Sequence, residues 1–533
     1  MDINLLTSLN DNIRIDREKC TSCGRCVEVC ILDNLRLQLS PCRQACPIGM
    51  NCQEYTRLLA RGKGDKGLEK IRETVPFGGI LGRICSKPCE AACNRAKVDS
   101  QPVAIRDLKR FLTDQYSLHW NPPANGDLPQ KVAIVGAGPA GLTAAFFLRS
   151  QGFQVTLYDR DSAPGGLMRW AIPEFRLPGE ILERETGFIK SMGIEFEGNR
   201  RLGKDLDLPV LGEKFDAVLV AIGAYKPVRL NVPGEKDSSI WPVLDFMKKV
   251  RVTKTLPIGE RVVVIGGGNA AVDAAQTAWR LGAKKVHLVS LEKRQEMPAF
   301  PWSIAEAEAE GVNILNGWGP QEFRLVKGRL VAVSLKKCAS VVDGQGNFCP
   351  SYDPKNTMEL PADTVILAIG QKVEMGSLGP AFKRKDELLY DGITLQTPNP
   401  KFFAAGDCLR GPKTIVEAMA QGKEAALSIQ RFLLGENLHY GRGNGSPYET
   451  QFEVDLSKAK PRARVPMREV ALAKRREFKE VALGYTKEEA LAEAERCLNC
   501  GVPFGLRTCW FCLPCEIECP EEALYVEIPY LLR

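Results

Sequence analysis

Histidine is nearly absent from this chain, with three residues among 533, and none of His119, His287 and His439 is spaced as part of a metal-ligand pair. A histidine-rich zinc enzyme is thereby excluded. The first twelve residues lack the basic start and apolar run of a secretory signal. The longest apolar stretch, Val132–Leu148, is interrupted by three glycines, so we expect no membrane span. Together these absences predict a protein of the reducing cytoplasm.

Nucleic-acid binding is also disfavoured by composition. The net charge of +7 is spread along the chain, and the dense basic tract Lys458–Arg476 has no interleaved aromatic residues. We therefore expect this tract to be a solvated face or a docking surface. With 533 residues, of which 44% are hydrophobic and 26% charged, the chain predicts a globular protein of three or more domains.

Cysteine, by contrast, is abundant, with 19 residues. Grouped C-x2-C spacings suit metal ligands better than disulfides in a large chain without a secretory signal. An iron–sulfur cubane needs converging thiolates, typically a closely spaced run and one more distant ligand. Three groups predict a [4Fe–4S] cluster each: Cys20, Cys23, Cys26 and Cys30; Cys509, Cys512, Cys515 and Cys519; and, more loosely, Cys46, Cys85, Cys89 and Cys93.

A glycine-rich segment at residues 136–141 has the context of a dinucleotide-binding unit. It lies between an expected strand, Lys131–Val135, and an alanine-rich helix, and the next strand ends at Asp159, 23 residues after Gly136. Gly136 allows the tight turn, Gly138 lets a pyrophosphate approach the helix N-terminus, and Asp159 accepts hydrogen bonds from a ribose diol. The expected cofactor contacts of this unit are Gly136, Gly138, Ala140, Gly141 and Asp159.

A second unit of the same kind begins at Arg261–Ile265. Its glycine-rich segment ends in alanine, an accepted variant of the pattern. Later strands are expected at Thr364–Ile369 and Lys401–Ala405, and the second of these leads into Gly406 and Asp407, which indicates that the first unit resumes after the second. The expected nucleotide contacts of the second unit are Gly266, Gly268, Asn269, Ala270, Ala271 and, after its last strand, Gly370.

Two nucleotide units beside clusters predict two different cofactors. One must bind a hydride donor such as NAD(P)H, and the other must hold a group that splits a hydride into single electrons, because clusters accept electrons singly. Flavin does this, so we expect FAD at the first unit. A helix that begins near Thr414 directs its positive end at the ligand and favours an anionic reduced flavin.

The expected fold class is α/β: two dinucleotide-binding, Rossmann-like domains, one inserted in the other, preceded by a helical iron–sulfur domain and flanked by ferredoxin-like terminal segments. The expected domains are a ferredoxin-like half at 1–38, a helical iron–sulfur domain at 39–125, an FAD domain at 126–255 and 371–435, an NAD(P) domain at 256–370, a linker at 436–496 and a terminal ferredoxin-like segment at 497–533.

Residues 41–435 resemble the small, flavin-containing subunit of glutamate synthase and its relatives, which include the N-terminal part of dihydropyrimidine dehydrogenase and the large subunit of ferredoxin-dependent transhydrogenase. The matching segments are Pro41–Pro47, Gly82–Cys93, Gly165–Leu177, Gly266–Asp273 and Ala405–Cys408. The resemblance implies FAD at the first fingerprint and NADPH at the second. It places Asp407 at the FAD ribityl chain and Asn269 and Glu296–Ala299 at the nicotinamide nucleotide. Further cofactor contacts are expected from Gly166, Leu167, Gly223, Thr414 and Ile415.

The chain departs from this family at the nucleotide phosphate. Where the relatives carry two arginines able to pair with a 2′-phosphate, this chain has Leu291 and Glu292. A carboxylate repels phosphate and suits a ribose diol, so we expect Glu292 to favour NAD(H) over NADP(H). Lys293 and Arg294 follow immediately and are able to compensate in part.

A further departure concerns the cysteines. The family has a C-x2-C before the position of Cys42, and this chain has none; its nearest C-x2-C of that kind is Cys497 and Cys500. These three residues are expected to form a fourth site. The alternatives are that Cys497 and Cys500 bind zinc or belong to the terminal cluster. Four further cysteines without spaced partners are expected to be buried or incidental thiols: Cys52, Cys338, Cys349 and Cys408.

The terminal cysteine motifs are additions to the family core. In a two-cluster ferredoxin the fourth cysteine of each half serves the other cluster. The two halves therefore combine into one split ferredoxin with Cys30 and Cys519 exchanged, or each is a separate docking point. Ile31 stands where proline usually follows the fourth cysteine.

Two functions remain open from the sequence. The first is a catalytic subunit of a multi-subunit NAD(P)H-dependent oxidoreductase, which exchanges electrons with other redox subunits or a ferredoxin through FAD and three or four clusters. The second is an electron-relay or scaffold subunit, for example of an electron-bifurcating complex, whose nucleotide site is not catalytic. Intact fingerprints favour the enzyme. No glutaminase domain is present, so the chain does not make glutamate alone.

Overall fold

The computed structural model describes residues 12–31, 34–117, 128–379, 382–384, 387–442, 448–505, 509 and 512–527. The segment examined for a secretory signal, up to residue 11, lies outside the described residues, as does the expected domain boundary at residue 125. In the described part, no helix is both long enough and apolar enough to cross a membrane.

The first nucleotide unit is built on a five-stranded parallel sheet with the order β19-β6-β3-β4-β5. Its central strands are buried, as expected for a parallel sheet covered on both faces. The last strand, β19, follows the second unit in the chain, so one unit is inserted in the other as predicted. The strands are β3 (Lys131–Val135), β4 (Gln154–Tyr158), β5 (Glu195–Glu197), β6 (Ala217–Val220) and β19 (Phe402–Ala404).

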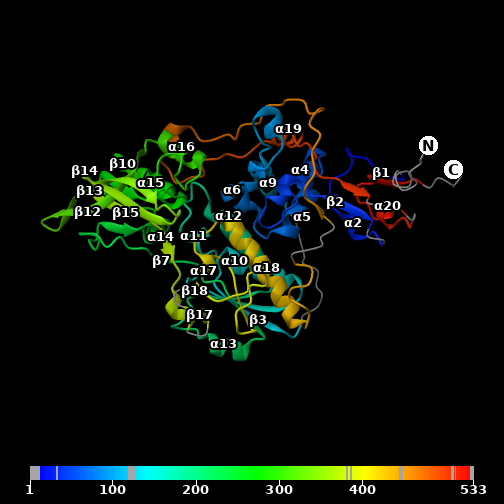
Figure 1. Cartoon of the computed structure of the whole chain (residues 1–533), viewed down its shortest axis with the longest axis horizontal. Helices are drawn as coiled ribbons and strands as arrows, with labels where there is room; N and C mark the ends of the chain where they lie inside the picture. Colours follow the sequence, from blue (N-terminus) through cyan, green and yellow to red (C-terminus); the bar gives the residue numbers. More distant parts are fainter. Residues whose placement is uncertain are drawn as a thin grey trace.

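Helices α10 (Pro139–Ser150) and α18 (Ile415–Leu433) pack together beside this sheet (Figure 1). Their approach is close because a side chain at Gly422 of α18 would overlap the carbonyl oxygen of Ala140 in α10. Smaller elements complete the unit: α11 (Leu167–Trp170), α12 (Gly179–Ser191), α13 (Leu208–Lys214), η1 (Met375–Leu378), β17 (Lys383–Arg384), β18 (Glu387–Leu388) and α17 (Asp407–Arg410).

The second nucleotide unit is a parallel sheet with the order β11-β10-β9-β15-β8. Its strands are β8 (Ile240–Pro242), β9 (Arg261–Ile265), β10 (Lys285–Ser290), β11 (Asn313–Asn316) and β15 (Thr364–Leu367), and its helices are α14 (Val243–Thr253), α15 (Asn269–Arg280) and α16 (Pro301–Ala309). Two short strands, β7 (Lys226–Pro227) and β16 (Gln371–Lys372), pair where the chain passes between the units.

Two features of this unit differ from expectation. The predicted start at residue 256 is wrong, because β8 pairs with β15 and α14 packs in the core of the second sheet. An edge strand of three residues is too short to show a period. The chain also inserts a three-stranded antiparallel sheet that was not predicted, made of β12 (Trp318–Val326), β13 (Arg329–Val342) and β14 (Phe348–Pro361).

A helical region precedes the first nucleotide unit and packs against it. Its core contains Tyr55, Phe77 and Leu108, all inaccessible to solvent. The fully buried carboxylate of Glu185 in α12 accepts hydrogen bonds from Arg72 at 2.9 Å and from the backbone of Gly79 at 3.1 Å, which fixes the two regions together. The helices are α3 (Pro41–Gln44), α4 (Cys52–Ala60), α5 (Gly64–Thr74), α6 (Gly78–Ile84), α7 (Pro88–Ala91), α8 (Ala96–Asp99) and α9 (Ile105–Gln115).

The two ends of the chain form one small unit. Strand β1 (Ile13–Ile15) pairs antiparallel with β22 (Leu524–Val526), and β2 (Leu35–Gln38) lies between β20 (Tyr448–Glu449) and β21 (Pro503–Gly505). The helices α2 (Arg25–Glu28) and α20 (Pro514–Ile517) contact each other. The sequence left open whether the two terminal cysteine motifs combine into one unit or form separate docking points. In the structure they combine. It lies at one end of the molecule, and β12–β14 lie at the other (Figure 1).

Residues 450–496 run back over the helical region with little regular structure beyond η3 (Leu472–Lys474) and α19 (Lys487–Ala494). The basic tract in this segment makes internal contacts: Arg464 pairs with Glu90 at 3.0 Å, and the guanidinium of Arg476 lies 4.0 Å from the ring centroid of Trp279. The tract is therefore exposed to solvent in part, and in part it holds the segment against the rest of the chain.

Arg496 anchors the end of this segment. It has no exposed surface, and its guanidinium donates to the carbonyl oxygens of Gln101, Pro102 and Arg462 and to the carboxylates of Asp99 and Glu493 at 2.7–3.0 Å. The planar fork of arginine matches such a set of acceptors. The next residue is Cys497, so this network positions the C-terminal cysteine pair on the helical region.

The network generates a testable prediction. Replacing Arg496 with Met leaves the buried carboxylate of Glu493 without its guanidinium, and breaking such a pair costs about 3–5 kcal/mol. We expect amide hydrogen exchange at residues 97–104 and 487–500 to accelerate by at least about 100-fold, if local opening governs it. Arg462→Met, which removes an exposed pair with Glu495, is the matched control and changes exchange by less than about fivefold. Equal effects of the two substitutions would contradict the anchoring role.

Candidate redox centres

The first glycine-rich loop leaves open space in front of its middle glycine. A side chain at Gly138 would meet no atom within 4 Å, whereas one at Gly136 would overlap the carbonyl oxygen of Ala221. Gly136 also has a φ of 114°, which favours glycine. Gly141 packs against the carbonyl of Gly136, which brings α10 close to the sheet. The loop therefore has the shape that a pyrophosphate at a helix N-terminus requires.

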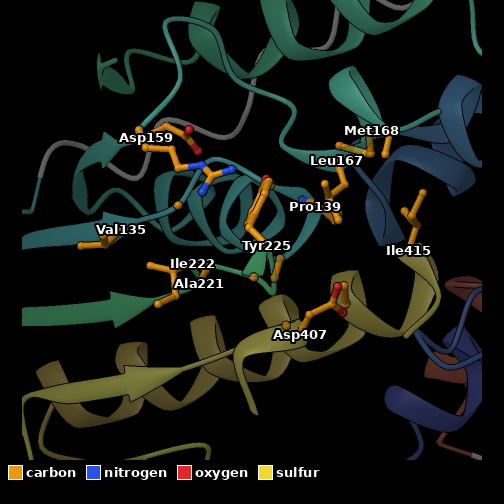
Figure 2. A pocket seen from close by; sticks show the side chains of 18 of the residues that line it. Val135, Pro139, Asp159, Leu167, Met168, Ala221, Ile222, Tyr225, Asp407 and Ile415 are labelled. Carbon is orange, nitrogen blue, oxygen red and sulfur yellow. The ribbon is translucent and has the colours of Figure 1, made fainter. Parts of the chain in front are cut away.

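Asp159 is held rigidly at the end of β4. Its carboxylate accepts backbone hydrogen bonds from Ala137 at 2.6 Å and from Asp161 at 2.8 Å, and burial raises its pKa. The side chain of Tyr225 lies between Asp159 and Asp407 in the cavity (Figure 2). The guanidinium of Arg160 lies 3.5 Å from the ring centroid of Tyr225.

Most of the predicted contacts of the first unit line one cavity, which extends from the glycine-rich loop to the N-terminus of α18. Gly141 and Gly166 contribute by packing instead, since a side chain at Gly166 would lie 2.8 Å from the Cα atom of Gly138. The predicted residues that line the cavity are Gly136, Gly138, Ala140, Asp159, Leu167, Gly223, Gly406, Asp407, Thr414 and Ile415. An open loop face, a ribose-binding carboxylate and a helix N-terminus in one cavity fit FAD.

Asp407 and the start of α18 form the far end of this cavity. Burial raises the pKa of Asp407 to about 6, and its carboxylate accepts a hydrogen bond from the backbone of Lys413 at 3.1 Å. Thr414 caps α18 reciprocally with Glu417: the backbone of Thr414 donates to the Glu417 carboxylate at 3.0 Å, and the Thr414 hydroxyl accepts from the backbone of Glu417. The helix therefore begins at a fixed point, with its positive end at the cavity.

The second unit borders a larger cavity of about 1070 Å³. A side chain at Gly268 would again meet nothing within 4 Å, so this loop too has an open face. The amide oxygen of Asn269 accepts a hydrogen bond from the backbone of Phe300 at 3.1 Å, and Pro298 lines the cavity beside it. Ala271 is buried behind the loop. The predicted residues that line this cavity are Gly266, Gly268, Asn269, Ala270, Glu292 and Gly370.

Glu292 lies against the glycine-rich loop of the second unit. Its carboxylate accepts a hydrogen bond from the hydroxyl of Ser290, and a side chain at Gly267 would come within 2.5 Å of it. The two neighbouring cations point to other partners: Arg294 pairs with Glu308 at 2.6 Å, and Lys293 lies 3.9 Å from Glu296 with 81% of its side chain exposed. Of these three residues, Glu292 is the one that lines the cavity.

The two cavities share a boundary. Ile172, Lys413, Thr414 and Ile415 line both of them. The larger cavity is also lined by Arg83, Ile84, Cys85, Ser86 and Arg106 of the helical region. The cavity of the second unit therefore adjoins both the cavity of the first unit, at the start of α18, and the helical region at Cys85.

Cysteines from the N-terminal motif lie close to cysteines from the C-terminal motif. The thiols of Cys20, Cys23 and Cys26 interact with that of Cys519, and a small cavity is lined by all four. Cys515 interacts in turn with Cys509, Cys512 and Cys30. Burial raises the pKa values of Cys23 and Cys515 to about 11 each. A buried thiol gives up its proton readily only when a positive centre replaces it.

The cysteines of the helical region separate into two sets. Cys42, Cys93, Cys497 and Cys500 line one cavity, and Cys500 interacts with both Cys42 and Cys93. Burial raises the pKa values of Cys497 and Cys500 to about 12 each. Cys85 interacts instead with Cys46 and Cys89. The sequence grouped Cys93 with these three, but α7 and the residues after it carry Cys93 towards the C-terminal pair.

The cysteines without spaced partners differ among themselves. Cys52 is buried and interacts with Cys42, Cys46 and Cys89, which spacing along the chain did not indicate. Cys408 is buried beneath the flavin cavity, where its thiol donates to the carbonyl oxygens of Val220 and Ala405. Cys338 is buried on β13, and Cys349 is exposed. Among the described residues, no three histidine, cysteine, aspartate or glutamate side chains lie close enough to hold a single metal ion.

Some cavity residues were missed by sequence reasoning. Arg160 and Tyr225 follow strands β4 and β6 at their carboxyl ends, which is where ligands bind in parallel sheets, so position alone was a usable signal. No such signal marked Trp302, whose ring lies 4.6 Å from that of Phe300 and 4.3 Å from the ammonium of Lys87.

Known families and proteins match both parts of the chain. The pyridine nucleotide-disulphide oxidoreductase family matches residues 130–422, and the family described as dihydropyrimidine dehydrogenase domain II, 4Fe-4S cluster, matches residues 12–119. The NADP(+)-dependent formate dehydrogenase subunit beta of Moorella thermoacetica is 33% identical over 500 residues, which cover 86% of this chain and 70% of that protein.

Two further relatives differ in the nucleotide that they are named for. The NADPH-Fe(3+) oxidoreductase subunit beta of Geobacter sulfurreducens is 32% identical over 520 residues, covering 86% of this chain and 75% of that protein. The NAD-dependent dihydropyrimidine dehydrogenase subunit PreT of Escherichia coli is 34% identical over 402 residues, covering 74% and 92%. Because these matches span the cysteine-bearing and nucleotide-binding segments together, the chain belongs to the family of iron–sulfur oxidoreductases that use FAD and NAD(P)H.

Proposed function

We propose that this chain exchanges hydride between NAD(H) and FAD and passes single electrons through four [4Fe–4S] clusters to a partner redox subunit or a ferredoxin. One observation carries the proposal: Thr414 and Ile415 line both nucleotide cavities, and Cys85 lines the larger of them. FAD supplies the conversion between a two-electron hydride and the single electrons that clusters accept. Relatives named as oxidoreductase subunits support a role within a larger assembly.

The chain's residues bind and orient the flavin nucleotide. Backbone N–H groups at the start of α10 would bind the pyrophosphate of FAD on the open side of Gly138. Asp159, fixed by two backbone donors, accepts hydrogen bonds from a ribose diol. Asp407, with a pKa of about 6, is mostly ionised at neutral pH and accepts hydrogen bonds from the ribityl hydroxyls. The N-terminus of α18 stabilises negative charge at the isoalloxazine end.

NAD(H) is the proposed nucleotide of the second site, in preference to NADP(H). Glu292 supports this, because its carboxylate lies beside the glycine-rich loop, where it accepts hydrogen bonds from a ribose diol and repels a 2′-phosphate. Arg294 is engaged by Glu308 and Lys293 extends into solvent. The relatives are divided, since PreT is named for NAD and the two beta subunits for NADP or NADPH.

Four cysteine sets are the proposed cluster sites. The terminal unit holds two clusters with exchanged ligands, one on Cys20, Cys23, Cys26 and Cys519 and one on Cys30, Cys509, Cys512 and Cys515. The helical region holds one on Cys42, Cys93, Cys497 and Cys500 and one on Cys46, Cys85 and Cys89. An iron–sulfur cluster is preferred to zinc at Cys497 and Cys500, because Cys42 and Cys93 complete a four-thiolate set whose members, in the described part of the chain, do not lie close enough together to hold a single metal ion.

The open loop faces generate a reciprocal pair of variants. A Cβ atom added at Gly138 or at Gly268 would meet no protein atom within 4 Å, so we expect a valine at either position to exclude a pyrophosphate and to leave the fold intact. We expect Gly138→Val to lose most of its FAD, measured by chromatography after acid release, while its iron content is kept. Gly268→Val keeps its FAD and loses reduction by NADH. Full FAD occupancy in Gly138→Val would contradict the flavin site.

The nucleotide preference is tested by stopped-flow flavin reduction. Losing one charge-assisted contact to phosphate costs roughly 1.5–3 kcal/mol, so NADH is expected to reduce the flavin at least about tenfold more efficiently than NADPH. Leu291→Arg combined with Glu292→Arg reverses the preference, whereas Lys293→Ala, the matched surface control, leaves it unchanged. More efficient reduction by NADPH in the parent chain would refute Glu292 as the determinant. No reduction by either nucleotide would favour the relay or scaffold function.

The metal content separates clusters from zinc. Anaerobically purified chain is expected to contain about sixteen iron atoms and as many acid-labile sulfides, four of each per cluster. Cys500→Ala lowers the iron content by about a quarter if a cluster binds there. About one zinc per chain, lost together with Cys500 at constant iron, would instead assign that site to zinc.

A further inference from the structure

One of the four cysteine sets is a ligand short. A cubane cluster carries four irons and takes one protein ligand on each. The set of Cys46, Cys85 and Cys89 offers three thiols. The neighbouring cavity is lined by Cys52 as well as by Cys42, Cys93, Cys497 and Cys500, and the last four make a complete set without Cys52. An additional ligand among the described residues must therefore come from near Cys46 and Cys89.

Cys52 lies at that position. Its thiol is 2% exposed and interacts with the thiols of Cys46 and Cys89, and also with that of Cys42 from the neighbouring set. Cys52 is the first residue of α4, a helix of nine residues whose N-cap Asn51 accepts a hydrogen bond from the backbone of Glu54 at 3.3 Å. The positive end of a helix stabilises a thiolate, which is the form that binds iron.

A buried lysine lies near the same four thiols. Lys109 on α9 is 4% exposed, and the thiols of Cys85, Cys89, Cys52 and Cys46 are among the groups that act on its ammonium. An ammonium has no lone pair and is not itself a ligand. Its positive charge offsets part of the negative charge of a cluster bound by these thiols.

We propose that Cys52 is the fourth ligand of the cluster held by Cys46, Cys85 and Cys89. The Cys52 thiol releases its proton, and its sulfur forms one bond to the fourth iron. The assignment rests on the proposed function in so far as that set holds a cluster. Because Cys52 also contacts Cys42, it brings this cluster next to the one on Cys42, Cys93, Cys497 and Cys500, which gives electrons a short path towards the ends of the chain.

The test uses the full chain, purified anaerobically, with iron and sulfide analysis and EPR spectroscopy before and after reduction by dithionite. Cys52→Ala is expected either to show the signal of a three-iron cluster when oxidised or to lose about four of its roughly sixteen irons. Cys52→Ser keeps the irons but shifts the EPR spectrum and the potential of one cluster, because oxygen replaces sulfur on one iron. A merely structural cysteine would not produce that shift.

Two controls make each outcome decisive. Cys338→Ala removes another buried cysteine, on β13, and leaves iron content and spectra unchanged. Cys46→Ala reports whether the set holds a cluster at all. If Cys46→Ala loses iron while both Cys52 variants match the parent chain, the proposal for Cys52 is overturned and the cluster remains. If Cys46→Ala and Cys52→Ala both leave iron and spectra unchanged, the cluster assignment of this set in the proposed function fails with it.

Discussion

Thiolates that serve one cluster have to meet at one point, and in this chain the proposed ligands come from opposite ends. Cys42 and Cys93 meet Cys497 and Cys500, and Cys519 meets the cysteines that follow β1. The chain therefore cannot form these sets until its last residues return to its first. The strand pair β1 and β22 and the Arg496 network make that return specific. The entropic cost of closing a loop rises only slowly with the length of the loop. A few buried contacts are therefore enough to hold the two ends of the chain together.

The same closure orders the redox sites. The helical region packs on the first nucleotide unit through Glu185, and this brings Cys85 to the cavity where both nucleotide units meet. Within the helical region Cys52 connects the two cysteine sets, because its thiol interacts with Cys46 and Cys89 of one set and with Cys42 of the other. Thr414 and Ile415 connect the two nucleotide cavities, since they line both. That continuity, more than any single motif, is what an electron-transfer subunit needs.

Much of this organisation could be predicted from the sequence because its signals are local. The glycine-rich loops are predicted by a strand, a tight turn that favours glycine and a helix in succession, as at Gly136. Gly406 and Asp407 predict that the chain returns to the first unit after the second. The remainder depends on contacts that no spacing encodes. Cys93 joins a set whose other members include residues about 400 positions away, and Cys52 has no regular spacing to its neighbours. Strand β8 is too short for a periodic pattern, and the strands β12–β14 belong to an insertion that neither fingerprint requires.

The central claim is that electrons pass from the nucleotide to the cysteine-bound clusters by way of the flavin. The most direct measurement is freeze-quench EPR of the anaerobic chain after rapid mixing with NADH, in parallel with the absorbance of the flavin. The account predicts that the flavin is reduced first, that cluster signals rise as it is reoxidised, and that chain stripped of FAD shows no cluster signal. Reduction of the clusters by NADH in the flavin-free chain, or a reduced flavin that leaves every cluster oxidised, would contradict it.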